Sequence, residues 1–288
     1  MLNIKEIMRF RELNPEPEEV TNIREKILST FNKLQFVEES HQYFLPNSKG
    51  ELIEYDCVSH ITHQFVPPTD WEQVAENYAI KHGRTKEEVQ EEWHYNNIKA
   101  TNSGTNVHEY AESFFYFIKG DVDKILPNYR RQLQDGYLLP NSPKQEAICR
   151  FWNDIFKVKE IYPVLAETKV YTGINNLYSL KTNYAGTFDL LLACKIGGKW
   201  KLLIYDYKTN EDLYSLYNRE NNKMLLAPFG DLVNENKSLY TLQLSCYELA
   251  LKQLGFEIAD RKIIWAKNDT TYEKISLPSC VDTLKNVL

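Results

Sequence analysis

Residues 184–209 read YAGTFDLLLACKIGGKWKLLIYDYKT, and this stretch decides the fold. Two runs rich in hydrophobic residues flank Gly197-Gly198, and a glycine pair between two such runs is typical of a tight β-hairpin turn. The sequence therefore predicts two antiparallel strands, one over Tyr184–Lys195 and the other over Lys199–Lys208.

Two acidic residues are expected to face each other in this hairpin. The register that pairs Ile196 with Lys199 across the turn also pairs Asp189 with Asp206, and opposite Cβ atoms lie about 4.5–5.5 Å apart. Two like charges among buried leucines are destabilising unless a positive charge lies between them. Lys208 follows Asp206 by two residues, so it projects from the same face. We therefore expect a bound divalent cation here, Mg²⁺ or in its place Mn²⁺.

A cation, two carboxylates and an amine suit the hydrolysis of a phosphodiester. The cation polarises a phosphoryl oxygen and acidifies water, and Lys208 orients that water or stabilises charge on the phosphate. A plainer interpretation stays open at this point. An Asp-x-Lys triplet is expected about once by chance in a chain of this length, and Asp206 and Lys208 are also compatible with an exposed strand.

Hydrophobic periodicity along the rest of the chain predicts an α/β protein with a helical front end. The expected elements, in chain order, are a polar opening to Glu19, a helix to Lys33, an antiparallel strand pair over 34–45 and 51–65, helices over 71–119 with starts at Arg84–Glu88 and Ser103–Thr105, an amphipathic helix over 143–159, a strand over 162–171, the hairpin, a long polar connection over 211–237, a helix over 238–254 and a strand over 261–267.

The stretch Gly186-Thr-Phe-Asp189, followed by a hydrophobic strand that ends in Asp206-Tyr-Lys208-Thr209, resembles the core of the PD-(D/E)XK nucleases, and specifically the RecB-like exonuclease branch. Two further marks of that branch are present in the family's order. The segment from Gly104 to His108 resembles its helical G-x-x-x-H motif, and the segment from Gln243 to Tyr247 resembles its Q-x-x-x-Y motif. The resemblance covers roughly residues 100–265.

The resemblance implies a fold and a division of the chain. The fold is a restriction-endonuclease-like α/β core, in which helices flank a central mixed β-sheet. Residues 99–288 would form this nuclease core, and residues 1–98 would form an α+β N-terminal elaboration packed on it.

The resemblance also implies roles for single residues. Asp189, Asp206 and Lys208 would be catalytic, and the metal ligands would be His108, Asp189, Asp206 and the carbonyl of Tyr207. Glu167 lies on the preceding strand, where the family carries an acidic residue, and would serve this metal or a second one; a surface glutamate is an equally simple interpretation. Gln243 and Tyr247, at i and i+4 on a helix, would contact DNA.

Composition sets limits on cofactors and partners. Some RecB-like relatives hold an iron–sulfur cluster on four cysteines, but the five cysteines here are scattered, so no iron–sulfur cluster is expected. The net charge of −6 argues against strong nonspecific coating of DNA, although the acidic excess lies in residues 1–150. No apolar run approaches the roughly 20 residues of a membrane span, so no membrane partner and a cytoplasmic location are expected.

These observations together predict a Mg²⁺-dependent DNA exonuclease of recombination, repair or phage DNA processing. Its expected partners are DNA and either a recombination protein or further copies of the chain. Three alternatives remain open: an endonuclease or junction resolvase with the same chemistry, a noncatalytic DNA-binding recombination module, and a hydrolase of small phosphate esters.

Overall fold

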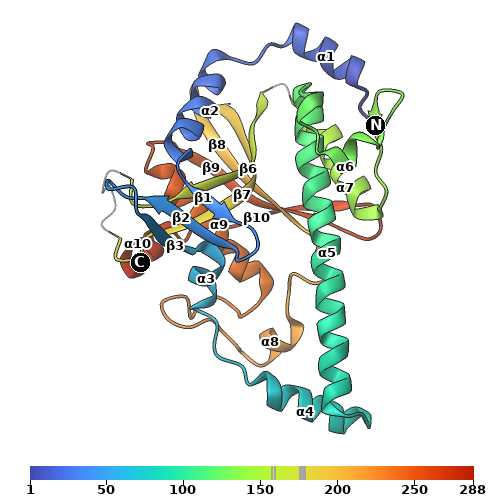
Figure 1. Cartoon of the computed structure of the whole chain (residues 1–288), viewed down its shortest axis with the longest axis vertical. Coiled ribbons are helices and arrows are strands. Elements are labelled where there is room, and N and C mark those ends of the chain that lie inside the picture. Colours follow the sequence, from blue (N-terminus) through green and yellow to red (C-terminus); the bar gives the residue numbers. More distant parts are fainter. Residues whose placement is uncertain (157, 159, 175–179) are drawn as a thin grey trace.

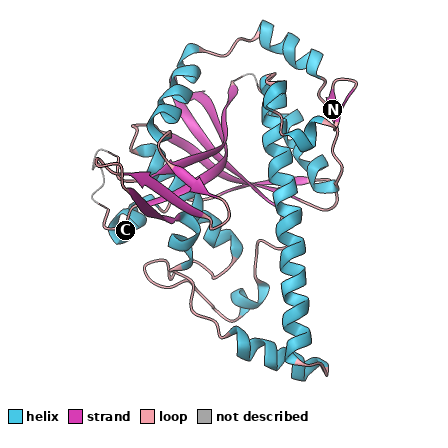
Figure 2. Ribbon diagram, viewed as in Figure 1, coloured by secondary structure: helices cyan, strands magenta, loops and turns pink. Residues whose placement is uncertain are grey.

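The computed structural model describes residues 1–156, 158, 160–174 and 180–288. A mixed β-sheet lies at its centre, and helices lie on both sides of that sheet (Figures 1 and 2). The long helix α5 (Lys86–Lys119) runs along one side of the molecule, and its N-terminal half extends beyond the sheet to α4 (Trp71–His82) (Figure 1). No helix in the part of the chain that the structure describes is both long enough and apolar enough to cross a bilayer.

The sheet has the strand order β1-β2-β3-β7-β8-β9-β10, and β6 also pairs with β7. The β3–β7 and β8–β9 pairs are parallel, and the others are antiparallel. The strands are β1 (Gln35–Val37), β2 (Gln42–Pro46), β3 (Leu52–Cys57), β6 (Ile161–Tyr171), β7 (Tyr184–Ile196), β8 (Lys199–Lys208), β9 (Ile258–Ala266) and β10 (Tyr272–Ser276). A separate small hairpin consists of β4 (Leu133–Gln134) and β5 (Tyr137–Leu138).

Alternate residues of β8 divide the interior into two cores, as expected of a strand covered on both faces. Leu202 and Ile204 face the core of α2, α3, α9 and α10, whereas Leu203 and Tyr205 face the core of α1, α5 and α7. The remaining helices are α1 (Ile4–Leu13), α2 (Glu18–Phe31), α3 (Val58–His63), η1 (Val122–Lys124), α6 (Pro127–Arg130), α7 (Pro143–Phe156), α8 (Leu216–Glu220), α9 (Asn236–Lys252) and α10 (Val281–Val287).

The predicted hairpin is confirmed. Gly197 and Gly198 have φ angles of +59° and +79°, a left-handed backbone that glycine adopts without steric cost. Pairing runs from Ile196–Lys199 back to Leu190–Tyr205, in the register that the sequence predicts. The coarse α/β expectation, a central mixed sheet flanked by helices, is confirmed as well.

Helix α5 confirms one predicted helix start and contradicts another. Thr85 caps the helix in a capping box with Glu88, as the sequence indicates. The expected second start at Ser103–Thr105 is wrong, because the helix continues through it. A single interior glycine costs a helix only about 1 kcal/mol, and the buried residues of the following turns, Val107 to Ile118, offset that cost.

Three other expectations need correction. The polar opening contains a helix, α1, which Asn3 caps through its side chain. The strand expected over residues 51–65 ends at Cys57, whose sulfur accepts a hydrogen bond from the backbone N–H of His60 and caps α3. The connection over 211–237 is not featureless, because it contains α8 and a β-bridge between Met224 and Val233.

The N-terminal segment joins the central sheet instead of forming a separate layer. Residues of β3 pair in parallel with the start of β7, at Asp56–Tyr184 and Cys57–Ala185. The expected boundary at residues 98/99 falls inside helix α5. The end of the amphipathic helix predicted over 143–159 lies partly outside the described residues, since 157 and 159 are not among them; the described part ends at Phe156.

Candidate functional site

A gap in the sheet positions the site. Ala185 of β7 pairs with Tyr171 of β6 and with Cys57 of β3, and Leu190 of β7 pairs with Ala166 of β6 and with Tyr205 of β8. Strands β3 and β8 therefore lie on the same edge of β7, which is the edge opposite β6. Among the described strands, none pairs with residues 186–189 on that edge.

Asp189 closes the end of the β7–β8 ladder with its side chain. Its Oδ2 accepts a 2.7 Å hydrogen bond from the backbone N–H of Tyr207, where a backbone carbonyl of β7 would otherwise serve. This bond links β7 to β8 beyond the point where their backbone hydrogen bonds end. Asp206 and Lys208 therefore lie beside the gap. The backbone ladder ends at Leu190–Tyr205, one step before Asp189 and Asp206, so the predicted pairing of the two aspartates lies beyond the ladder.

His108 and Glu167 reach Asp189 from two other elements. His108 Nδ1 lies 3.3 Å from Asp189 Oδ2 and 3.8 Å from Glu167 Oε1. Donor atoms of these three residues lie within 4.8 Å of one another, as in a metal site. Glu167 has a φ of +42°, which a non-glycine residue in a strand rarely adopts. Backbone strain of this kind is common at functional sites.

Asp206 and Lys208 form the second part of the site. The Asp206 side chain is 1% exposed, and Lys208 Nζ lies 2.5 Å from its Oδ2. This contact pairs Oδ2 with the ammonium, whereas the other oxygen of Asp206, Oδ1, is buried without a hydrogen-bond partner among the described residues. The ring of Tyr240 on α9 packs 4.2 Å from Lys208 Nζ and holds the amine over the gap.

The structure groups the predicted ligand side chains differently from the sequence-based expectation. The sequence places Asp189 and Asp206 around one ion, whereas the group with metal-site spacing in the described part of the chain is His108, Glu167 and Asp189. The amide of Tyr207 is bonded to Asp189, so its peptide is fixed between the two aspartates.

The charges at the gap strongly perturb one another. Burial and the charge of Asp189 raise the pKa of Asp206 to about 6, and burial raises the pKa of Glu167 to about 7. Burial also opposes ionisation of Asp189, but His108, Lys208 and the Tyr207 amide outweigh it, so the pKa of Asp189 is lowered. Burial lowers the pKa of His108, but Asp189 and Glu167 raise it well above its ordinary value. The site contains more buried negative charge than its own cations balance.

These residues fit a divalent cation. Asp206 Oδ1 is buried without a hydrogen-bond partner among the described residues, and an unsatisfied buried carboxylate oxygen is costly. Three carboxylates and an imidazole form a donor set that Mg²⁺ accepts and Mn²⁺ suits well. We therefore regard the gap as a candidate metal centre.

A pocket of about 540 Å³ surrounds this centre, within the usual range for ligand sites. Gln243 and Tyr247 both line it, and Gln243 Nε2 donates to the Tyr247 hydroxyl at 3.1 Å. Tyr247 is only 3% exposed. A Cβ on Gly186 would lie 2.9 Å from the Tyr247 ring, so this glycine is needed for Tyr247 to pack against β7.

Sequence reasoning missed several residues of the pocket wall. The hairpin β1–β2 contributes Phe36, His41 and Tyr43, and strand β6 contributes Lys169. Lys169 follows Glu167 by two residues, as Lys208 follows Asp206. The same spacing argument could therefore have predicted Lys169 as a residue of the site. The contribution of β1–β2 depends on the pairing of β3 with β7, and no local pattern indicates it.

Comparison with known proteins identifies no relative. No family model matches the chain, and no curated protein matches it. The resemblance to RecB-like nucleases therefore remains a hypothesis that depends on the motifs and on the geometry of the gap.

Proposed function

We propose that this protein is a metal-dependent DNA exonuclease that hydrolyses phosphodiester bonds in recombination, repair or phage DNA processing. The observation that carries the proposal is the convergence of His108, Glu167, Asp189, Asp206 and Lys208 on one gap in the sheet. These residues come from α5, β6, β7 and β8, so no single local pattern explains their meeting.

Each residue has a task in such a reaction. His108, Glu167 and Asp189 would hold the cation, and Asp206 would complete its shell from the opposite side of the gap. A divalent cation supplies charge stabilisation for the phosphate and acidifies water. Lys208, which contacts Asp206 and the Tyr240 ring, would orient the attacking water or stabilise charge on the phosphate.

The surroundings suit a charged, extended substrate. Lys169 and Lys208 line the pocket among four carboxylates, Glu38, Glu112, Glu167 and Asp189, so a bound cation would be needed to offset the acidic charge toward phosphate. Strong global attraction of DNA is not expected at a net charge of −6, so binding would depend on this local groove and on the cation.

The test is digestion of end-labelled linear and circular DNA with Mg²⁺ and with EDTA. We expect the wild-type protein to degrade linear DNA with Mg²⁺ and to leave circular DNA intact. Asp206→Ala and Lys208→Ala should abolish degradation while the proteins still fold. Lys199→Ala is the matched control, because Lys199 lies on the same strand and its side chain is 74% exposed.

Each other outcome has a clear meaning. Full activity in purified Asp206→Ala or Lys208→Ala would refute the assigned roles. Cleavage of circular DNA would show that the protein is an endonuclease with the same chemistry and not an exonuclease. Metal-independent binding of DNA without any cleavage would indicate a noncatalytic module.

A further inference from the structure

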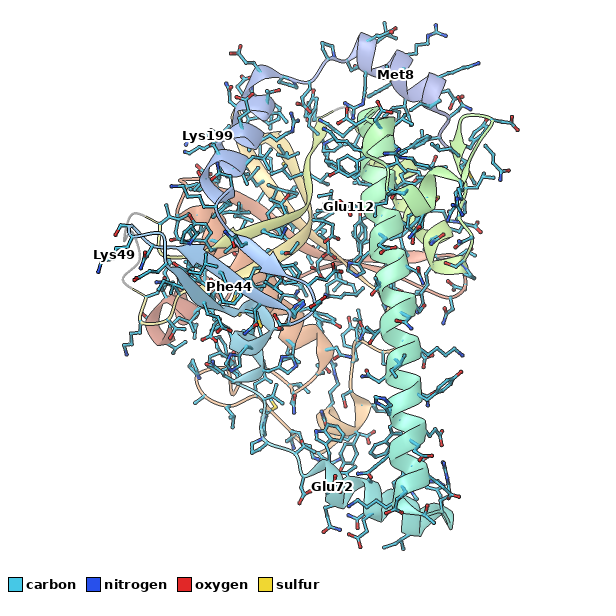
Figure 3. All side chains as sticks on the ribbon, in the orientation of Figure 1. Met8, Phe44, Lys49, Glu72, Glu112 and Lys199 are labelled. Carbon is cyan, nitrogen blue, oxygen red and sulfur yellow. The ribbon has the colours of Figure 1, made fainter. Side chains whose placement is uncertain are left out.

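An aromatic cluster lies at the wall of the catalytic pocket, and the proposed hydrolysis leaves it without a role. It comes from the hairpin β1–β2 and consists of Phe36, His41 and Tyr43. The Phe36 and Tyr43 ring centres lie 4.7 Å apart, and those of Phe36 and His41 lie 5.1 Å apart. All three residues line the pocket that also contains His108 and Asp189. In Figure 3, the labelled Phe44 marks β2 and the labelled Glu112 marks the facing part of α5.

The hairpin is anchored to the strand that carries Asp189. The Tyr43 hydroxyl lies 3.0 Å from Thr187 Oγ1, and Thr187 precedes Asp189 by two residues. Tyr43 is 3% exposed, so its main task is to hold the hairpin in place. Phe36 is half-buried and His41 is exposed, so their rings remain accessible from the pocket.

A cation lies over the Phe36 ring. Lys169 of β6 is paired with Thr187 in the sheet, and its Nζ lies 5.9 Å from the centre of the Phe36 ring. Lys169 is exposed and lines the same pocket. Such a pair can bind the two parts of a nucleotide, because the base can take the place of the amine on the ring and the amine can neutralise the neighbouring phosphate.

A second cavity extends this wall away from the metal centre. It has a volume of about 450 Å³, follows β6, and shares Glu167 and Lys169 with the catalytic pocket. Lys124 and Arg24 also line it. Arg24 is paired with Glu16 and Lys124 with Asp121, so a strand that passes the metal centre along β6 would compete with these carboxylates for the two cations.

We propose that Phe36 and Lys169 form a platform that holds an unpaired base and its neighbouring phosphate, so that the substrate enters as a single strand. A base that stacks on a protein ring inside a pocket has left its own base stack. The inference rests on the proposed function, since it names the substrate class of the same site. It assigns the selection of that substrate to the N-terminal hairpin and not to the catalytic residues.

The test compares a short fluorescein-labelled thymidine strand with a strand of the same length made of abasic residues. Binding is measured by fluorescence anisotropy with Ca²⁺ in place of Mg²⁺. The wild-type protein should bind the thymidine strand more tightly than the abasic one. Phe36→Ala should weaken binding of the thymidine strand by about 5- to 150-fold and leave the abasic strand unaffected, because stacking on one ring contributes about 1–3 kcal/mol per base.

Further variants distinguish the effect of the Phe36 ring on binding from effects of folding and of the Lys169 charge. Phe36→Tyr should keep wild-type affinity, since it keeps the ring. Val37→Ala is the matched control, because Val37 is the next residue of β1 and is 42% exposed. Lys169→Ala should weaken binding of both strands equally and reduce the salt dependence.

Two results would overturn the platform: equal affinity of the wild-type protein for both strands, or an equal loss for both strands in Phe36→Ala. Cleavage of the thymidine strand with Mg²⁺ is measured in parallel and tests the proposed function separately. Base discrimination without cleavage would refute the hydrolysis alone, and cleavage without base discrimination would refute the platform alone.

Discussion

The chain contains the triplet Asp-x-Lys on two neighbouring strands, and the two copies differ in their surroundings. Asp206-Tyr207-Lys208 ends β8, and Asp260-Arg261-Lys262 lies on β9, which pairs with β8 in parallel. In both copies the amine contacts the carboxylate, at 2.5 Å in β8 and 3.0 Å in β9. The Asp206 side chain is 1% exposed, whereas that of Asp260 is 29% exposed.

The difference lies in what else each carboxylate meets. Asp260 accepts hydrogen bonds from the backbone N–H of Arg261 at 2.8 Å and from Ser276 Oγ at 3.4 Å, in contact with solvent. Asp206 has the contact with Lys208 at Oδ2, but its Oδ1 has no partner among the described residues, and the carboxylate lies near the charge of Asp189. Identical spacing therefore produces a balanced ion pair in one strand and an excess of buried negative charge in the other. The proposed function depends on that excess and not on the triplet.

The largest expected effect is on catalysis. Asp206→Asn should lower Mg²⁺-dependent cleavage of linear DNA by at least about 1,000-fold, because it removes a charge that the reaction uses. Asp260→Asn should stay within about twofold of the wild type. Initial rates on end-labelled DNA measure both, and thermal unfolding checks the fold. If Asp260→Asn were folded but inactive, the distinction between the two triplets would fail.

A smaller effect is expected on stability in the presence of metal. At about 100 times its Kd, Mn²⁺ should stabilise the wild-type protein by about 2.7 kcal/mol, because it binds the folded state alone. Asp189→Asn should lose most of this stabilisation, since Asp189 belongs to the three-residue group. Thermal unfolding with Mn²⁺ and with EDTA measures it.

Asp260→Asn is the control for the metal experiment and should keep the full shift. An equal shift in wild-type protein, Asp189→Asn and Asp206→Asn would place the binding of Mn²⁺ outside the gap. Loss of the shift in Asp206→Asn as well as in Asp189→Asn would show that one ion spans both parts of the site.

The hairpin and the strand positions of its two aspartates could be predicted from the sequence, because the two-residue turn at Gly197-Gly198 pairs Ile196 with Lys199. Every later pair then follows, and the structure has this register as far as Leu190–Tyr205. The capping box at Thr85 could be predicted for the same reason, since its two partners lie within one helical turn.

The rest of the site could not be predicted, because it depends on long-range pairing. The gap beside Asp189 exists only because β3 occupies the start of the β7 edge, and no local pattern links Cys57 to Ala185. The strand expected over residues 51–65 was wrong from Val58 onward. Val, Ile and Thr are typical of strands, but Val58, Ile61 and Thr62 are buried residues of helix α3. Likewise, the positive φ of Glu167 depends on its position in the sheet, which the local sequence does not indicate.

The smallest expected effect is the dependence of metal-free stability on pH. A carboxyl group whose pKa is higher in the folded state than in the unfolded state binds more protons when folded, so stability is lost as the pH rises between the two values. For Asp206 this window runs from 3.8 to about 6, and for Glu167 from 4.5 to about 7. Without metal, the wild-type protein should therefore lose stability between about pH 4 and pH 7.

Asp206→Asn should remove the Asp206 part of this loss. Its stability relative to the wild type should grow from near zero at low pH to about 1–3 kcal/mol at neutral pH, since one pKa unit corresponds to about 1.4 kcal/mol. Urea unfolding in EDTA measures the difference, and Asp260→Asn should follow the wild type throughout. If metal-free Asp206→Asn were instead less stable than the wild type at neutral pH, the attraction of Lys208 would outweigh burial and the repulsion from Asp189. Asp206 would then be balanced like Asp260, and the reason for expecting a cation beside it would be lost.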